Sequence, residues 1–451
     1  MEKHFITIGI ITGKKKMTKK GFIFSAMLAG SISCMQAQTQ MLTMDEVFRL
    51  ADENSKSINI HSLMTDEAEK AIEIAKNDLL PSVGAKANVQ YIGNCVTFDR
   101  DYSNWETGEL PHFGNSLILK ATQVIYAGGK IKNNINLKRL EKESSVQDEI
   151  LNRQDLRFLL AGYYLEISKL SNQKFVYENN ISQTKLLVKD MQAAYKQGTA
   201  LKSDITRYEL QLQHLELGLT SVKNRINVIS YKLASTIGLD PNIKIATDTA
   251  SLLRLPIESK SQELWLNNKE EIPMMKKADL NIKMSENKIK SIKGEYLPDI
   301  RFAVTGEMTG PIMVEVPPLD INFAYWFAGI EISYNLDMLF KGKKKMRHAR
   351  INRQKMIVEK EYAEEELENS VHEACIGLDE AYTRMQTRLK SVQLAHENYN
   401  IVRQRYLNGL SLITDMLDAG NTQLDTELQL ANDRINIIYQ YLLLKKITGT
   451  L

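Results

Sequence analysis

An internal duplication is the feature that most constrains the fold of this chain. Residues 42–241 and 262–451 follow one plan, and three landmarks recur in the same order in both halves. The paired landmarks are Leu80-Pro81 with Leu297-Pro298, Tyr126-Ala-Gly-Gly-Lys130 with Phe340-Lys-Gly-Lys-Lys344, and Tyr195-x-x-Gly198-x-x-Leu201-x-x-Asp204 with Tyr406-x-x-Gly409-x-x-Leu412-x-x-Asp415. Ordered landmarks of this kind favour a duplication with small insertions over chance similarity between helices.

The first half is expected to run helix, strand, loop, strand and long helical hairpin. Thr43 and Glu46 form a capping box, which satisfies free N–H groups of the first helical turn. We expect this helix to run to Leu80 and to stop at Pro81, which has no N–H to donate. Two strands are predicted within residues 82–126, one from the apolar–polar alternation over residues 83–91 and one around Leu117, Leu119 and Ala121. A polar loop joins these strands, and a helical hairpin is predicted over 128–238.

The second half repeats this order after a linker at residues 242–261. Its two strands are predicted within residues 299–338, where apolar and polar side chains again alternate. The intervening loop holds three prolines, at positions 311, 317 and 318. A second helical hairpin is predicted over 342–447.

The helical segments are unusually long. Proline is missing from residues 112–240 and 319–451, and apolar side chains there are spaced four and three residues apart. An unbroken example is the seam Tyr208, Leu212, Leu215, Leu219, Val222, Ile226, Ile229 and Leu233. Sustained heptads predict coiled-coil packing. A helix over residues 130–197 would extend about 100 Å at 1.5 Å per residue.

The N-terminus has the layout of a secretory signal peptide, which we assign to residues 1–37. A lysine-rich stretch at 14–20 precedes a short apolar core at 22–32, and small or polar residues follow. The mature chain is expected to begin near Gln38. Met17 is an alternative start, and Cys34 an alternative lipidation site, although Ser31-Ile32-Ser33-Cys34 is a poor lipobox.

The strands predict an oligomer. No apolar stretch of 18 residues occurs after residue 38. A part of the chain that crosses a membrane would therefore have to be a β-barrel. Four strands cannot close a barrel by themselves, since single-chain barrels begin at eight. Three chains would supply twelve strands and leave a passage. The predicted fold class is therefore mainly α with membrane β: a trimeric 12-stranded barrel, four strands per protomer, continued by a long α-helical coiled-coil tunnel.

The ordered landmarks, together with Leu42-Thr-Met-Asp-Glu46 and Asp415-Met-Leu-Asp418, resemble the TolC family of outer-membrane efflux proteins. The resemblance covers essentially the whole mature chain. It implies a homotrimeric, passive channel in outer-membrane lipid, with a periplasmic extension and no cofactor. It also implies two partners, a periplasmic adaptor and an inner-membrane transporter, in tripartite efflux or type I secretion. The exported cargo does not follow from the resemblance.

The resemblance also assigns the functional residues. The turns between the long helices would be the periplasmic, adaptor-docking tips, where glycine suits the reversal because it tolerates positive φ. These tip residues are Gly198, Thr199, Ala200 and Leu201 in the first half and Gly409, Leu410, Ser411 and Leu412 in the second. The pore-gate residues would be Asp415, Asp418, Asp204 and Tyr406. Ser411 departs from the family pattern, in which an arginine takes part in closing the gate, so closure is expected to be weaker or differently made.

Two other classes of protein fit the sequence less well. Seven scattered histidines with no HExxH or other metal spacing, and no phosphate-binding or nucleophile motif, argue against an enzyme or a metal site. Asp415 and Asp418 lie three residues apart, which suits a carboxylate pair but favours a solvated face or pore ring. A periplasmic coiled-coil adaptor or structural protein is the alternative function, although adaptors usually have one long hairpin.

The net charge and the cysteines do little to narrow the function further. A net charge of +3 does not indicate nucleic acid, and the basic run 341–347 more plausibly marks a helix start. Cys95 and Cys375 can remain free or form a bridge.

Overall fold

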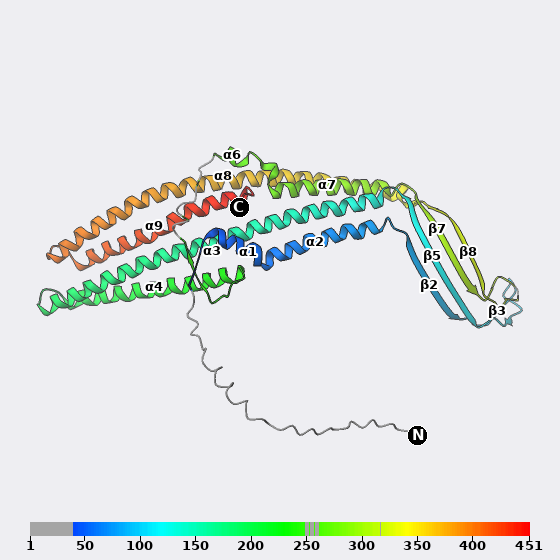
Figure 1. The fold of residues 1–451 in the computed structure, drawn as a ribbon, viewed down its shortest axis with the longest axis horizontal. Coiled ribbons are helices and arrows are strands. Elements are labelled where there is room, and N and C mark those ends of the chain that lie inside the picture. Colours follow the sequence, from blue (N-terminus) through cyan, green and yellow to red (C-terminus); the bar gives the residue numbers. More distant parts are fainter. Residues whose placement is uncertain (1–38, 249–251, 253–256, 258–260, 316) are drawn as a thin grey trace, which may run out of the picture.

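The computed structural model describes residues 39–248, 252, 257, 261–315 and 317–451. The expected signal peptide, its cleavage near Gln38, the Met17 start and the Cys34 lipidation site lie outside the described residues. The protein is elongated, with a layer of long helices that continues at one end into a sheet (Figure 1).

The first repeat unit holds four helices and two long strands. In chain order these are α1 (Met44–Asn54), α2 (Lys56–Asn77), β2 (Ser82–Tyr91), β5 (Phe113–Ala127), α3 (Lys130–Lys196) and α4 (Lys202–Thr236). The capping box at α1 forms, with the Thr43 amide donating to Glu46 Oε2 at 2.8 Å and the Glu46 amide to Thr43 Oγ1 at 3.3 Å. The predicted single helix up to Leu80 is wrong, because Ser55 has an extended backbone with φ −70° and ψ 126° between α1 and α2.

The second repeat unit has the same order. Its elements are α6 (Gln262–Leu266), the 3₁₀ helix η1 (Lys269–Glu271), α7 (Pro273–Gly294), β7 (Asp299–Gly310), β8 (Phe323–Ser333), α8 (Asp337–Leu407) and α9 (Ile413–Ile447). Helix α8 begins five residues earlier than the sequence indicated, so the basic run 341–347 lies inside it.

The long strands form one antiparallel sheet with the order β2-β5-β7-β8. Ser82 lies opposite Thr122 in β5, and Asp299 lies opposite Ser333 in β8, while a bulge interrupts β5 between Val124 and Tyr126. Strands β2 and β8 are the edges, and every residue of both is exposed in the protomer. This sheet therefore offers two unpaired edges to other chains.

Two short pairings were not predicted from the sequence. Strands β3 (Cys95–Thr97) and β4 (Glu106–Gly108) form a hairpin inside the expected polar loop. Strands β1 (Thr39–Leu42) and β6 (Lys244–Thr247) form a parallel pair beside α3 and α4.

The helices share a core midway along the molecule, to which both repeats contribute. It includes Val47 of α1, Tyr164 of α3, Leu233 of α4 and Ile438 of α9, all buried. The protomer is mostly helical, and each repeat contributes two strands to the four-stranded sheet. The predicted fold class is confirmed.

Cys95 and Cys375 are both free, so the bridge left open by the sequence does not form. Within the described residues, no helix combines the length and the apolar character that crossing a membrane requires.

Candidate functional site: the paired helical tips

Both tips are tight turns in which glycine adopts the left-handed backbone. Gly198 joins α3 to α4 with φ 77°, and Gly409 joins α8 to α9 with φ 71°. In the first turn the amide of Thr199 donates to the Ala194 carbonyl at 3.0 Å, and in the second the Leu410 amide donates to the Arg405 carbonyl at 2.8 Å. These bonds satisfy carbonyls at the helix ends in the manner of a Schellman motif.

Large apolar side chains are exposed at both turns. Leu201, Leu410 and Leu412 have 67%, 68% and 70% of their surface accessible. Leu201 and Leu412 are equivalent in the two repeats, so each turn offers an exposed apolar side chain three residues after its glycine.

Behind the turns, one hydrophobic cluster holds the two hairpins together. We call it the tip cluster; its buried members are Leu187, Val188, Met191, Ile205, Tyr208, Ile413 and Met416, with Tyr399, Val402, Tyr406 and Leu417 packed against them. Because its members come from α3, α4, α8 and α9, the relative position of the two tips is fixed by side-chain packing.

At the edge of this cluster, Tyr406 and Asp204 meet. The Tyr406 hydroxyl donates to Asp204 Oδ2 at 3.2 Å, which links α8 to α4. Burial, followed by the nearby Asp204 carboxylate and this hydrogen bond, raises the pKa of Tyr406 to about 12. The phenol therefore stays protonated, and remains a donor, throughout the ordinary pH range.

The other two predicted gate residues lie at the start of α9. Asp415 Oδ2 accepts hydrogen bonds from the Leu412 amide at 3.0 Å and from Ser411 Oγ at 2.8 Å. Asp415 thus caps α9, and Ser411 contributes to the tip through this bond. Asp418, one turn further, is exposed, and its carboxylate has no hydrogen-bond or ion-pair partner among the described residues.

The structure brings Asp204 and Tyr406 into contact, and places Asp415 and Asp418 together on the exposed side of α9, away from buried Ile413 and Met416. Sequence reasoning missed the capping role of Asp415. The signal was available, because Asp415 stands three residues after Leu412 at the end of a turn, where a carboxylate accepts backbone amides.

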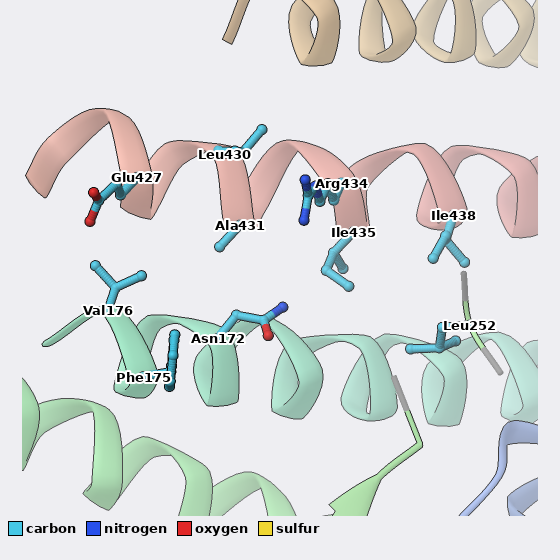
Figure 2. A pocket seen from close by; sticks show the side chains of 10 residues that line it. All are labelled: Asn172, Phe175, Val176, Leu252, Glu427, Leu430, Ala431, Arg434, Ile435 and Ile438. Carbon is cyan, nitrogen blue, oxygen red and sulfur yellow. The ribbon is translucent and has the colours of Figure 1, made fainter. Parts of the chain in front are cut away.

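Between the tip cluster and the central core, α3 and α9 line a partly open cavity of about 340 Å³. Figure 2 shows Val176 and Phe175 of α3 on one side and Ala431 and Ile435 of α9 on the other. The cavity interrupts the packing between the two hairpins at this level.

In the part of the chain that the structure describes, no group of histidine, cysteine, aspartate or glutamate side chains is arranged to hold a metal ion.

Comparison with known proteins identifies the fold. Residues 268–450 match the family model described as outer membrane efflux protein. Among solved structures, the outer membrane protein VceC from Vibrio cholerae matches with a TM-score of 0.73 at 14% identity, covering 90% of this chain and 96% of that one. The CmeC outer membrane channel of Campylobacter jejuni matches with a TM-score of 0.70 at 12% identity, covering 98% of this chain and 94% of the other.

The open state of the MtrE outer membrane channel of Neisseria gonorrhoeae has a TM-score of 0.69 at 17% identity, covering 90% of this chain and 88% of that one. A comparison with curated protein sequences gave no match.

The fold is therefore that of solved outer membrane channels, with a four-stranded sheet continued by long helical hairpins. More particularly, residues 268–450, from η1 through α9, match the family model of outer membrane efflux proteins. The prediction from the ordered landmarks is thereby confirmed. Of the matching proteins, CmeC and MtrE are described as outer membrane channels.

Proposed function

We propose that three copies of this chain form the passive exit duct of a tripartite efflux or type I secretion machine. The observation that carries the proposal is the four-stranded sheet with two fully exposed edges, joined to two long helical hairpins. Pairing β8 of one copy with β2 of the next, three times, would close twelve strands into a barrel wide enough to leave a passage. The hairpins would continue its wall into the periplasm.

In this proposal the tips close the periplasmic end. The Tyr406–Asp204 hydrogen bond helps to hold the second hairpin against the first, together with a bond from Gln211 of α4 to Asn421 of α9 at 2.8 Å. The cavity above the tip cluster interrupts the apolar packing between α3 and α9, and regions with fewer buried contacts open at lower free-energy cost. Movement of α8 and α9 away from α4 would therefore open the duct.

The exposed leucines at both turns support docking of a periplasmic adaptor at residues 198–201 and 409–412. The adaptor would link the duct to an inner-membrane transporter, which would provide the energy. The chain itself would carry out no catalysis and need no cofactor.

The test is a mass measurement of the detergent-extracted outer-membrane protein, followed by single-channel recording in a planar bilayer. A complex of three chains that conducts ions is expected. A stable monomer, or a water-soluble protein without channel activity, would contradict the duct and would favour the periplasmic adaptor alternative. Drug and metal sensitivity after gene deletion would then identify the cargo.

A further inference from the structure

We infer that α8 of each protomer packs against α2 of the next protomer through a seam in which basic residues of α8 face acidic residues of α2. This inference rests on the proposed ring of three copies. Beyond that ring, it specifies which helix faces meet and which side chains set their register. It also predicts that reversing one charge weakens the contact and that exchanging both charges restores it.

The order of the elements brings these two helices together at the ring closure. Helix α2 packs against α3, α3 against α7, and α7 against α8, which is the same order as β2, β5, β7 and β8 (Figure 1). Helix α2 leads into the edge strand β2, and α8 follows the edge strand β8. Pairing β8 with the next copy's β2 therefore places α8 beside that copy's α2.

Helix α8 has an apolar stripe that the protomer leaves uncovered. Phe340, Ile351, Val358 and Tyr362 are 81%, 61%, 51% and 61% exposed. They are eleven, seven and four residues apart in turn, and each of these intervals is close to a whole number of helical turns, so they lie on one side of the helix. The side that faces the protomer's own interior is different, because Met338, Gly342 and Ala349 are buried there.

The same stripe carries positive charge at Lys344 and Arg347, between Phe340 and Ile351. Both are exposed, and neither side chain has an ion-pair partner among the described residues. Their neighbours differ, since Lys341 pairs with Asp337 and Lys345 pairs with Glu295 at 2.5 Å. Cations spaced three or four residues apart repel each other along a helix, so an opposite charge from outside would stabilise this stretch.

Helix α2 has a matching stripe of opposite sign. Ile60, Met64 and Ile74 are 56%, 49% and 68% exposed. Glu67 and Asp78 lie on the same stripe, at intervals of three and four residues from these apolar side chains. Glu67 is exposed and, within the described chain, has no ion-pair partner.

The two stripes also match in height. Both helices end at the sheet, α2 at Asn77 and α8 at Asp337, and Figure 1 shows these ends gathered beside it. At 1.5 Å per residue, Ile74 and Phe340 each lie about 5 Å from that end, and Glu67 and Arg347 each about 15 Å. Met64 and Ile351 follow at about 20 Å. Apolar residues would thus meet apolar residues, with Arg347 opposite Glu67.

A charge exchange tests the pairing. Arg347→Glu and Glu67→Arg should each lower the fraction of trimer in detergent several-fold at low salt, whereas the double variant should restore most of it. Asp66→Arg is the matched control, because Asp66 is exposed but points about 100° away from Glu67 around the helix. It should leave the trimer unchanged and should not rescue Arg347→Glu. Intact trimers in both single variants, or a double variant no better than either, would overturn the pairing.

Cross-linking provides a second measurement that does not depend on stability. With Cys95 and Cys375 changed to serine, Ile74→Cys combined with Phe340→Cys should give covalent trimers under oxidation, while either cysteine alone should give none. Absence of cross-linked species in a folded trimer would reject the proposed faces. Wild-type protein that fails to trimerise would instead count against the duct itself, which keeps the two failures distinguishable.

Discussion

The phenol of Tyr406 and the carboxylate of Asp204 join the two halves of the duplicated chain at their far ends. Their hydrogen bond, 3.2 Å between Tyr406 Oη and Asp204 Oδ2, spans from α8 to α4. The shared tip cluster positions both side chains. This polar contact, held in place by apolar packing, therefore contributes to keeping the hairpins together at their tips.

Replacing Tyr406 by phenylalanine removes this bond and keeps the ring in the cluster. Hydrogen bonds to charged groups contribute about 1.5–3 kcal/mol, so the closed arrangement should become roughly ten-fold or more less favoured. Single-channel recording should show larger or more frequent openings. Tyr399→Phe is the control, since its hydroxyl has no hydrogen-bond partner among the described residues although the ring packs in the same cluster. Equal behaviour of the two variants would argue against the contact.

Alkaline pH should open the same contact. The folded-state pKa of Tyr406 is raised from 10.0 to about 12, chiefly by burial. Its contribution is therefore complete below pH 10 and is lost as the pH rises from 10 to 12, where the phenolate repels Asp204. Conductance of the wild-type channel should increase over that interval more than conductance of Tyr406→Phe. Parallel curves would assign the change to other groups.

The glycine turns should tolerate bulk less than they tolerate a methyl group. At Gly198 and Gly409 an added Cβ meets open space, but the positive φ strains any L-residue, by about 1 kcal/mol. Gly198→Ala and Gly409→Ala should thus retain most export. Gly198→Trp and Gly409→Trp should abolish it while the trimer remains in the membrane, because the indole covers the proposed adaptor surface.

Export assays with membrane fractionation distinguish these outcomes. Loss of export in the alanine variants would point to turn strain, and full export in both tryptophan variants would exclude adaptor contact at these turns.

The central core should depend on Tyr164. Its buried hydroxyl donates to the Leu42 carbonyl at 2.8 Å and accepts from the Asp248 amide at 2.9 Å, so it fastens the ends of β1 and β6 to α3. Tyr164→Phe should destabilise the protein by about 1–3 kcal/mol, because buried backbone groups lose a partner. Thermal unfolding of the detergent-solubilised trimer measures this. Tyr163→Phe, half-buried beside it, is the comparison and should have a smaller effect.

The sequence predicted the features that repeat along a helix or strand. The four-three spacing from Tyr208 to Leu233 corresponds to side chains that are buried or half-buried in α4. Alternation around Val83 and Ile300 located β2 and β7. Such periodicity is local, so a single chain records it directly.

Contacts between segments far apart in the chain leave no such periodic pattern in the sequence. The break at Ser55 involves neither glycine nor proline, and β1 and β6 are four residues each, with some two hundred residues between them. Tyr406 and Asp204 were named as gate residues through the family resemblance, and the composition of either helix gives no reason to pair them. The capping bonds of Asp415 depend on the turn geometry at Leu412, which the duplication alone does not specify.

The last prediction concerns Asp418 and the charge of the pore. Asp415 and Asp418 are both exposed on α9, and threefold symmetry would arrange them as two rings of carboxylates. Acidic rings attract cations and select for them in pores. Because Asp415 also caps α9, Asp415→Ala would loosen the helix start as well as remove charge. Asp418→Asn avoids that ambiguity, since the Asp418 carboxylate has no hydrogen-bond or ion-pair partner among the described residues.

We expect Asp418→Asn to reduce cation selectivity and block by multivalent cations, with unchanged thermal stability. Asp415→Asn keeps an oxygen that can accept from the Leu412 amide, so it should act in the same direction with little loss of the cap. Asp425→Asn serves as the charge control, because Asp425 is exposed two turns further along α9 and accepts a hydrogen bond from Gln429 at 2.5 Å. Reversal potentials in a salt gradient give the selectivity. If Asp418→Asn matches wild type while Asp425→Asn does not, the gate lies further along α9 than the tip, and the carboxylate rings belong there.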